Sequence, residues 1–309
     1  MRSDEVIKIC VPGSTANLGP GFDSIGLAVN KYLTLEVVRS VDWAFYPQTE
    51  EVSSIPRGEE NLIYKVASAL AADYDCSLPP CSVKVSSDIP IARGLGSSAA
   101  AIVAGVELTN ELCGLELSIE EKLRAASENE EHPDNVGASL FGGLVIGSHR
   151  EDDTDLLHFT DLLIDIVVVI PDYEVMTKDA RSVLPSNLTH HQAVEASSIS
   201  NVLVAAILTK NWDLAGKMME KDMFHQPYRS TLIPEVNEVR AVAIENGAFG
   251  VALSGAGPTV ICFAEKGKGN HLCQKLKEKF DGYVVEELKI DTIGSSVEFL
   301  SDQSVECFK

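Results

Sequence analysis

The chain has 309 residues, a length at which one hydrophobic core commonly gives way to two domains in contact. Hydrophobic residues make up 45% and charged residues 23%, which is typical of a globular protein and excludes a disordered one. The formal net charge of -21 argues against a nucleic-acid partner and against an anionic membrane surface, because both carry negative charge. A small phosphorylated ligand is not excluded, since backbone N–H groups hold phosphate in acidic proteins too.

The seven cysteines are odd in number, and no C-x-x-C pair occurs. Cys10 and Cys262 lie in apolar, strand-like runs, which is typical of reduced, buried thiols. We therefore expect no disulfide and a reducing compartment. The N-terminus is too short and acidic for a signal peptide, and the longest apolar run, at 202–208, is far below the roughly 20 residues of a membrane span. The expectation is a cytoplasmic protein that binds no membrane.

In chain order, the first half begins with a predicted strand at 6–11 and a Gly- and Pro-rich loop at 12–26. There follow a strand at 33–38, a helix at 60–73, a strand at 81–86, and a Gly/Ser loop at 94–100 that opens into a helix ending near residue 113. Ser118 and Glu121 form a capping-box pattern that predicts the start of another helix. A strand at 142–148 closes this half.

The second half begins with a continuous apolar run at 164–170, which predicts a buried strand. Thr189 and Gln192 form a second capping box, which predicts a helix to about residue 209. The remaining predicted elements are helices at 214–220 and 234–246, strands at 250–253 and 259–264 around a glycine turn, a helix at 270–280 and a strand at 283–289.

Helices and strands alternate irregularly, which predicts an α+β protein rather than a doubly wound parallel sheet. We expect two domains, 1–157 and 158–309. The acidic stretch at 150–155 then serves as a solvated connection near the boundary.

The strongest chemical signal is the run Pro90-Ile-Ala-Arg-Gly-Leu-Gly-Ser-Ser-Ala-Ala-Ala101. Gly94 and Gly96 let the backbone turn so that several N–H groups point into one concavity, at the positive end of the following helix. This combination predicts a polyphosphate cradle, although it is neither a Walker A loop nor a G-x-G-x-x-G fingerprint. The alternative is a glycine loop that only turns a strand into a helix.

A second signal is the run Glu130-Glu-His-Pro-Asp-Asn135, in which acids end a helix and expose a carboxylate in a loop. Mg²⁺ is commonly held by one or two carboxylates together with substrate phosphates. The alternatives are a solvated helix end and, for His132, a packed loop residue.

Three further segments are weaker signals. The loop at 12–26 surrounds Asn17 and Asp23 with residues that favour special backbone angles, so a fixed binding loop or a purely structural loop is expected. The run at 253–260 is a tight glycine turn between strands. Arg181 and Arg229 lie in loop-like contexts where a guanidinium can bind a carboxylate, although most surface arginines bind nothing.

Together, the segments at 12–26, 90–101 and 253–260 resemble, in this order, three motifs of the GHMP kinases. The resemblance spans most of the chain. It implies an N-terminal domain like the second domain of a small-ribosomal-subunit protein, a ferredoxin-like C-terminal domain, and a catalytic cleft between them. It also implies transfer of the γ-phosphoryl group of ATP, with Mg²⁺, to the hydroxyl of a small metabolite.

Within the family, the runs at 12–23, 132–135, 177–181 and 225–229 are similar to those of the branch that acts on L-homoserine. This implies formation of O-phospho-L-homoserine on the way to threonine. The resemblance implies ATP contacts from Asn61 and from Ile91, Ala92, Arg93, Gly94, Leu95, Gly96, Ser97, Ser98, Ala99, Ala100 and Ala101. It implies Mg²⁺ ligands at Ser98 and Glu130. It implies substrate contacts from Asn17, Asp23, Asn135, Arg181 and Arg229, with Thr177 near the attacking oxygen.

Asn135 stands where several members of the family have an aspartate that accepts the proton of the attacking hydroxyl. An amide is no base, so we expect direct in-line attack, with the γ-phosphate itself receiving the proton. Glu131 stands where the family usually has glycine, which strains the turn if that position needs a positive φ. The remaining alternatives are a kinase for a mevalonate-like or sugar substrate and a non-catalytic ATP or amino-acid sensor. Members of the family often pair, so a homodimer is a further expectation.

Overall fold

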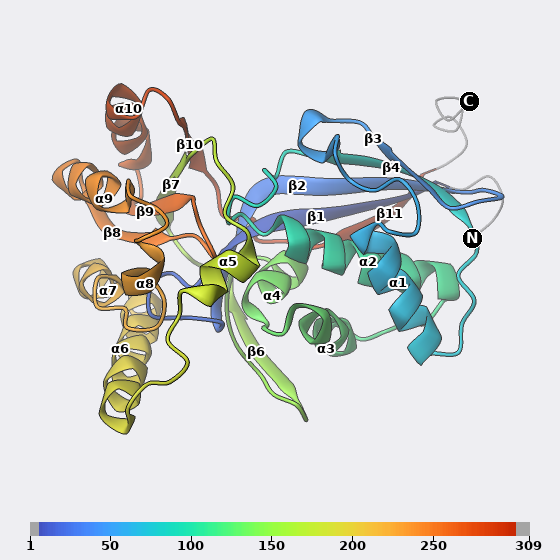
Figure 1. Cartoon of the computed structure of the whole chain (residues 1–309), viewed down its shortest axis with the longest axis horizontal. Coiled ribbons are helices and arrows are strands. Elements are labelled where there is room, and N and C mark those ends of the chain that lie inside the picture. The colour runs from blue at the N-terminus through green and yellow to red at the C-terminus, as the bar shows by residue number, and fades with distance from the viewer. Residues whose placement is uncertain (1–5, 301–309) are drawn as a thin grey trace.

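The computed structural model describes residues 6–300, which form two sheets with helices packed on them (Figure 1). Within these residues, the first sheet has seven strands in the order β11-β1-β2-β4-β3, with β5 paired to β2 and β6 paired to β5. The strands are β1 (Val6–Ala16), β2 (Ile25–Arg39), β3 (Ala44–Pro47), β4 (Cys81–Ser87), β5 (Leu144–His149), β6 (Thr154–Phe159) and β11 (Ser296–Leu300). A 3-10 helix, η1 (Glu50–Val52), follows β3.

Helices α1 (Leu62–Asp73), α2 (Ser97–Cys113), α3 (Ile119–Glu130) and α4 (Asp134–Phe141) lie on one face of this sheet (Figure 1). The central helix α2 packs against α1, α3, α4 and β1 and is buried around most of its circumference. Its sequence is mostly apolar for this reason, although the buried part also contains Glu107, Thr109 and Asn110. The packing fixes the N-terminus of α2, which carries the predicted phosphate loop, rigidly against the sheet.

The second sheet has the strand order β10-β7-β9-β8, and all of its pairings are antiparallel. Its strands are β7 (Ile164–Ile170), β8 (Ala248–Leu253), β9 (Val260–Glu265) and β10 (Val284–Leu288). The helices of this half are α5 (Thr177–Ser182), α6 (His190–Leu208), α7 (Trp212–Met219), α8 (Gln226–Arg229), α9 (Val236–Glu245) and α10 (Gly269–Lys279).

The apolar run of β7 is explained by helices on both of its faces. Ile166 and Val168 belong to a cluster with α6 and α7 that continues into the core of the first domain. Val167 and Val169 belong to a separate cluster with α9 and α10. Because successive side chains of a strand point to opposite faces, β7 is buried on both sides. One hydrophobic cluster therefore spans both domains, and a second one lies within the second domain.

The predicted α+β architecture is confirmed, and most of the predicted elements are present within a few residues of their expected bounds. Both capping boxes form as predicted. Ser118 accepts a hydrogen bond from the backbone N–H of Glu121, and Thr189 accepts one from that of Gln192. Local signals of this kind act over three or four residues, so the rest of the chain does not alter them.

The expected loop at 12–26 is shorter than predicted. Residues 12–16 continue β1 and pair with β2, with an irregularity between Pro12 and Gly13. The loop proper spans 17–24 between the two strands. Proline is tolerated here because the register shifts at this position, so that its missing N–H breaks no regular ladder.

Strand β6 runs across the predicted boundary between residues 157 and 158, and the domain bounds stay a prediction. The acidic stretch at 150–155 is not a connection: it forms the turn and first residues of the β5–β6 hairpin, where His149 pairs with Thr154. The chain also returns to the first sheet at its end, because β11 pairs with β1. Strand pairing between the two ends of the chain cannot be inferred from local composition.

The expectation of no disulfide is wrong. Cys76 and Cys113 are joined by a disulfide, with their Cα atoms 6.2 Å apart. α1 and α2 pack side by side with their N-termini at the same end, and this parallel arrangement brings the two cysteines together at the other end. Among the described residues, no helix is long and apolar enough to cross a membrane. The cytoplasmic location stays a prediction.

Glu131, which stands where the resemblance implies glycine, has a positive φ, so the condition for strain at this position is met. It is the C-cap of α3, with φ at 71° in the left-handed region, and its N–H donates to the Ser127 carbonyl at 2.8 Å. Residues with a Cβ rarely adopt this conformation, whereas glycine does so freely. The helix therefore ends on a strained residue immediately before the run that contains Asn135.

We expect Glu131→Gly to raise the free energy of unfolding by about 0.5–1 kcal/mol, because relief of strain exceeds the added freedom of the unfolded chain. Urea denaturation measures this change. Glu128→Gly is the matched control: it places glycine inside α3, where the free energy of unfolding should fall by about 1 kcal/mol. Equal losses in both variants would contradict the assignment of strain to position 131.

Candidate active site

The three motif segments meet at the hydroxyl of Ser254. Its Oγ is hydrogen-bonded to the Gly94 carbonyl at 2.5 Å and to Thr15 Oγ1 at 2.8 Å. The Ser14 N–H donates to the Leu95 carbonyl at 3.1 Å, which adds a second link between β1 and the loop. Segments that lie far apart in the sequence are thereby held in one arrangement between the two domains.

Glycine is required at two positions of this contact. Gly94 has φ of 80°, and a Cβ there would lie 2.2 Å from the Ser254 carbonyl oxygen. Gly96 has φ of 75°, and a Cβ there would lie 2.3 Å from Ser14 Oγ. Both backbone conformation and space therefore exclude any side chain. The two glycines therefore permit the loop to lie in direct contact with Ser254 and Ser14.

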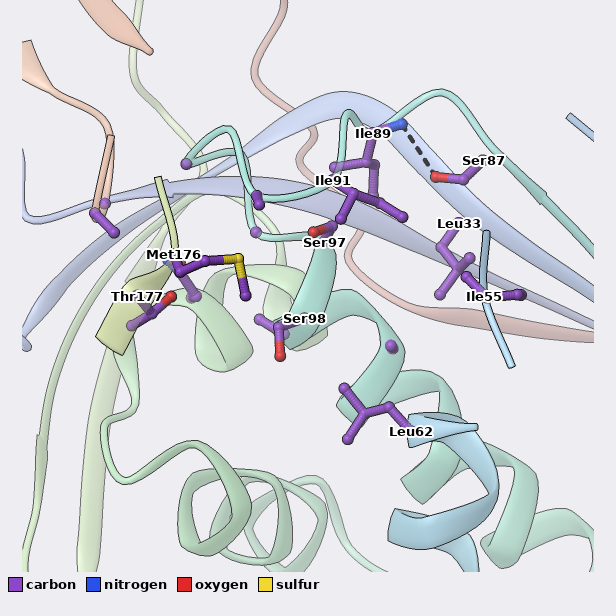
Figure 2. Close-up of a pocket in the computed structure, with 18 of the residues that line it drawn as sticks. Leu33, Ile55, Leu62, Ser87, Ile89, Ile91, Ser97, Ser98, Met176 and Thr177 are labelled. Carbon is purple, nitrogen blue, oxygen red and sulfur yellow. Dashed lines mark hydrogen bonds between the residues drawn. The ribbon is translucent and has the colours of Figure 1, made fainter. Parts of the chain in front are cut away.

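α2 begins directly behind this loop, at Ser97, with Gly96 as its N-cap. Gly96 has no side chain that could accept a hydrogen bond, so no N-cap side chain pairs with the first N–H groups of α2. Free N–H groups and the positive end of the helix dipole together attract anions. The Ser97 and Ser98 side chains lie at this end, and Met176 and Thr177 border the same cavity (Figure 2).

A cavity of about 410 Å³ lies over this helix end. One part is polar and is bordered by Ser97, Ser98, Glu130, Asn135 and Thr177. The other part is apolar, and Figure 2 shows side chains from several elements around it. They are Leu33, Ile55, Leu62, Ile89 and Ile91. A ligand with a flat apolar group and an anionic group fits this division.

Glu130 presents its carboxylate to the polar part of the cavity. Burial raises the pKa of Glu130 to about 7, although the positive charge of His132 opposes part of this rise. No hydrogen bond or ion pair within residues 6–300 engages this carboxylate. A buried carboxylate without a partner, beside the Ser98 hydroxyl, is a donor set that suits a hard divalent cation.

Asn135 offers a free donor to the same space. Its backbone is fixed, because its N–H donates to Asp134 Oδ1 at 2.7 Å and its carbonyl accepts from Ser14 Oγ at 3.2 Å. Its side-chain Nδ2 is buried and has no hydrogen-bond partner among the described residues. Buried amides are normally paired, so this one points to a ligand that supplies the acceptor.

A second group of charged side chains adjoins the cavity. Arg181 forms a two-pronged ion pair with Asp23, with N–O distances of 3.0 and 3.2 Å. Asp23 is held by its own N–H, which donates to Asn17 Oδ1 at 3.0 Å, and Asn17 Nδ2 donates to the Gly255 carbonyl at 3.1 Å. Gly255 itself borders the cavity. The predicted acceptor-binding residues therefore form one cluster at the side of the cavity.

Arg229 is 2% exposed and is fixed by three hydrogen bonds. It donates to the Gly255 carbonyl at 2.9 Å, to the Ala180 carbonyl at 3.2 Å and to His225 Nδ1 at 3.2 Å. Burial and the charge of Arg181 lower the pKa of Arg229 to about 10, so it is still cationic at neutral pH. Two guanidinium groups thus approach the same space, which suits an anionic carboxylate.

His225, Phe22 and His132 belong to this cluster, although the sequence prediction did not assign them. Burial and the charge of Arg229 lower the pKa of His225 to about 3, so it is neutral and accepts from Arg229. The Arg181 and Arg229 guanidinium carbons lie 5.6 and 5.2 Å from the centre of the Phe22 ring. The four-residue spacing of His225 and Arg229 was the available signal, because it places both on one helix face.

His132 is paired with Asp134 across 2.6 Å. Burial alone lowers its pKa, but the hydrogen bond and charge of Asp134 outweigh burial and raise it to about 9. His132, Asp134 and Asp23 bring one ligand atom each within 4.8 Å of the others. The protonated imidazole therefore balances the charge of Asp134, while Arg181 balances that of Asp23.

The predicted site residues fall into two sets. Bordering the cavity are Asn61, Ile91, Ala92, Gly94, Gly96, Ser97, Ser98, Ala99, Ala101, Glu130, Asn135 and Thr177. Not bordering it are Asn17, Asp23, Arg93, Leu95, Ala100, Arg181 and Arg229. Leu95 and Ala100 are buried in the core. Asn61 caps α1 by accepting from the Ile63 N–H at 2.9 Å and donates to the Pro56 carbonyl at 2.8 Å, so its side chain has a structural task.

Comparison with known proteins identifies the family. Residues 61–143 match the family described as "GHMP kinases N terminal domain", and residues 203–282 match "GHMP kinases C terminal". The chain is 57% identical to the homoserine kinase of Bacillus licheniformis over 98% of this chain and 99% of that protein. It is 55% identical to the homoserine kinase of Bacillus velezensis over 96% of each.

Among solved structures, the homoserine kinase of Cytophaga hutchinsonii is 29% identical, with a TM-score of 0.83 over 96% of this chain and 98% of that one. Mevalonate kinase shares the fold, at 15% identity and a TM-score of 0.69. Sequence, fold and the meeting of the three motifs at one cavity agree: the chain belongs to the GHMP kinase family.

Proposed function

We propose that the chain transfers the γ-phosphoryl group of ATP to the side-chain hydroxyl of L-homoserine, forming O-phospho-L-homoserine for threonine synthesis. The observation that carries the proposal is the Arg181–Asp23 pair, with Arg229 beside it, at the edge of a cavity bordered by the N-terminus of α2. The high identity to homoserine kinases over almost the whole chain supports the choice of substrate.

An Arg–Asp pair is complementary to a zwitterionic amino acid. The substrate carboxylate would bind Arg181 and Arg229, and its ammonium group would bind Asp23, so one ion pair is exchanged for two. A mevalonate-like acid has no ammonium group, and a neutral sugar has neither charge. Either would leave Asp23 or the arginines without a new partner, which is a penalty for a partly buried charge.

The nucleotide would lie with its base in the apolar part of the cavity and its phosphates against the amides of the loop and α2. Ser98 and Glu130 would hold Mg²⁺. This ion, when bound, neutralises charge on the group in transfer. The unpaired Glu130 carboxylate fits that role, because a neighbouring cation would favour its ionised form despite burial.

Neither Asn135 nor its neighbour Asp134 is suited to removing the proton of the attacking hydroxyl. Asn135 is an amide, and the Asp134 carboxylate is already engaged by His132 and by the Asn135 N–H. The Asn135 side-chain amide would instead position the substrate, and the proton would pass to the γ-phosphate during in-line transfer. A base typically contributes about 10²–10⁴-fold, and good alignment compensates for its absence in a loose transition state.

The metal and substrate assignments stay predictions, as does the homodimer, which rests on resemblance to the family. The first test of the proposed function is ADP release by the purified protein with Mg²⁺, ATP and a panel of alcohols. We expect release with L-homoserine but not with mevalonate or galactose. Release with mevalonate and not homoserine would overturn the proposal.

We expect Glu130→Gln to lower kcat by about 10²–10³-fold, since the amide cannot neutralise a divalent cation. Steady-state ADP release measures this change. Glu131→Gln is the matched control, because it alters an exposed carboxylate one residue away; its kcat should stay within about twofold of the wild type. Full activity of Glu130→Gln would remove Glu130 from the metal site.

We expect Arg181→Lys to raise KM for L-homoserine by about 10–100-fold while KM for ATP changes little. A lysine cannot make the two-pronged contact with a carboxylate, and loss of a charged hydrogen bond costs about 1.5–3 kcal/mol. Arg240→Lys, at a residue that bonds Asn237 on α9, is the control and should leave both constants unchanged. A rise confined to KM for ATP would place Arg181 at the nucleotide instead.

The raised pKa of Glu130 predicts the pH dependence of stability in the metal-free protein. Between pH 4.5 and about 7 the folded state binds more protons at Glu130 than the unfolded state does, so stability falls as pH rises through this window. We expect Glu130→Gln to be more stable than the wild type at pH 8, by about 1–2 kcal/mol, with the difference vanishing near pH 4. Urea denaturation in EDTA measures it, and a constant difference across this range would contradict the assignment.

A further inference from the structure

Arg93 is the one basic residue in the run at 90–101, yet its side chain does not border the cavity. Its neighbours Ile91, Ala92 and Gly94 all do. An arginine in a phosphate loop is normally expected to bind phosphate. Here the guanidinium instead turns outward to the second domain.

The guanidinium group holds two consecutive backbone carbonyls. Arg93 Nη1 donates to the Pro171 carbonyl, and Nη2 donates to the Asp172 carbonyl at 2.6 Å. Its planar fork matches this pair of acceptors, and a lysine ammonium would not. Pro171 directly follows the buried strand β7, so the Arg93 guanidinium is hydrogen-bonded to a rigid part of the second domain.

A backbone contact reinforces the same junction. The Val175 N–H donates to the Ala92 carbonyl at 3.2 Å. Ala92 has φ of 52°, in the left-handed region that a residue with a Cβ seldom adopts. Such a conformation persists where surrounding contacts determine it, and here the contacts come from residues 171–175.

Residues 171–175, which the loop contacts through Ala92 and Arg93, come just before the helix that carries the proposed acceptor-binding residues. α5 begins at Thr177, which borders the cavity, and carries Arg181, which pairs with Asp23. The hydrogen bonds of Arg93 therefore connect the proposed nucleotide-binding loop to the chain segment that leads directly into α5, the helix proposed to contact the acceptor.

We propose that Arg93 is a positioning residue that couples nucleotide binding to acceptor binding, and that it is not a phosphate ligand. The inference rests on the proposed function. A nucleotide that orders the loop also orders residues 171–175, because the Arg93 guanidinium is hydrogen-bonded to them. Ordering of these residues in turn orders α5, which follows them in the chain. Because coupling between two ligands is reciprocal, L-homoserine then tightens nucleotide binding by the same factor.

The test uses full-length Arg93→Lys and Arg93→Gln. Calorimetry gives the Kd of a non-hydrolysable ATP analogue with Mg²⁺, with and without saturating L-homoserine. Without homoserine, both variants should bind the analogue within about threefold of the wild type. The factor by which homoserine tightens binding should fall at least about fivefold in both, and KM for homoserine should rise more than KM for ATP.

Arg124→Gln is the matched control. Arg124 also donates to two carbonyls, those of Arg150 and Glu151, at 2.8 and 2.7 Å, but it does so at the β5–β6 hairpin away from the cavity. Its loss should affect stability to a similar degree and leave the coupling factor unchanged. A thermal unfolding curve of each variant verifies that the folded protein is being compared.

Two results would overturn the inference. One is analogue binding that weakens tenfold or more in Arg93→Gln and recovers in Arg93→Lys, because that pattern indicates a phosphate contact made by charge. The other is a coupling factor that is unchanged in both variants, or is absent from the wild type. Failure of the proposed function is distinct: the wild type would then release no ADP in response to homoserine.

Discussion

The architecture of the site depends on a buried hydrogen-bond junction between β1, the phosphate loop and the glycine turn after β8. Ser254 joins the Gly94 carbonyl to Thr15, and the Gly255 N–H donates to the Ala16 carbonyl at 3.1 Å. These groups are shielded from water, so leaving any of them unpaired would be costly. A hydrophobic cluster that spans both domains adds to this junction in fixing the arrangement of the domains around the cavity.

Charge around this junction is arranged by burial rather than by the overall balance of the acidic chain. Arg229 is buried and fixed by neutral partners, and His225 accepts from it because burial keeps that imidazole neutral. Arg181 is balanced by Asp23, and His132 neutralises Asp134. Two polar groups that have no partner among the described residues, the carboxylate of Glu130 and the side-chain amide of Asn135, border the cavity. These are the groups for which a bound ligand supplies the missing partners.

Features that depend on a few adjacent residues could be predicted. The capping boxes at Ser118 and Thr189 begin helices as expected, and the glycines at 94 and 96 turn the chain into the N-terminus of α2. Features that need partners from distant parts of the chain could not. Neither the Cys76–Cys113 disulfide nor the return of β11 to the first sheet leaves a local signal. For Glu131, resemblance to the family raised the question of a positive φ, and the structure answers it at the end of α3.

The sequence by itself determined the types of group available: a glycine loop before a helix, an acidic residue ahead of His-Pro-Asp-Asn, and two arginines in the second half of the chain. Tertiary structure decided which of them face one another and in what state of charge. Asp23 and Arg181 meet across 158 positions of sequence, and Arg93 turns from the cavity to carbonyls at the end of β7. The physical reason is range, because backbone preferences act over a few residues, whereas burial, pKa and ion pairing depend on whatever packing brings into contact.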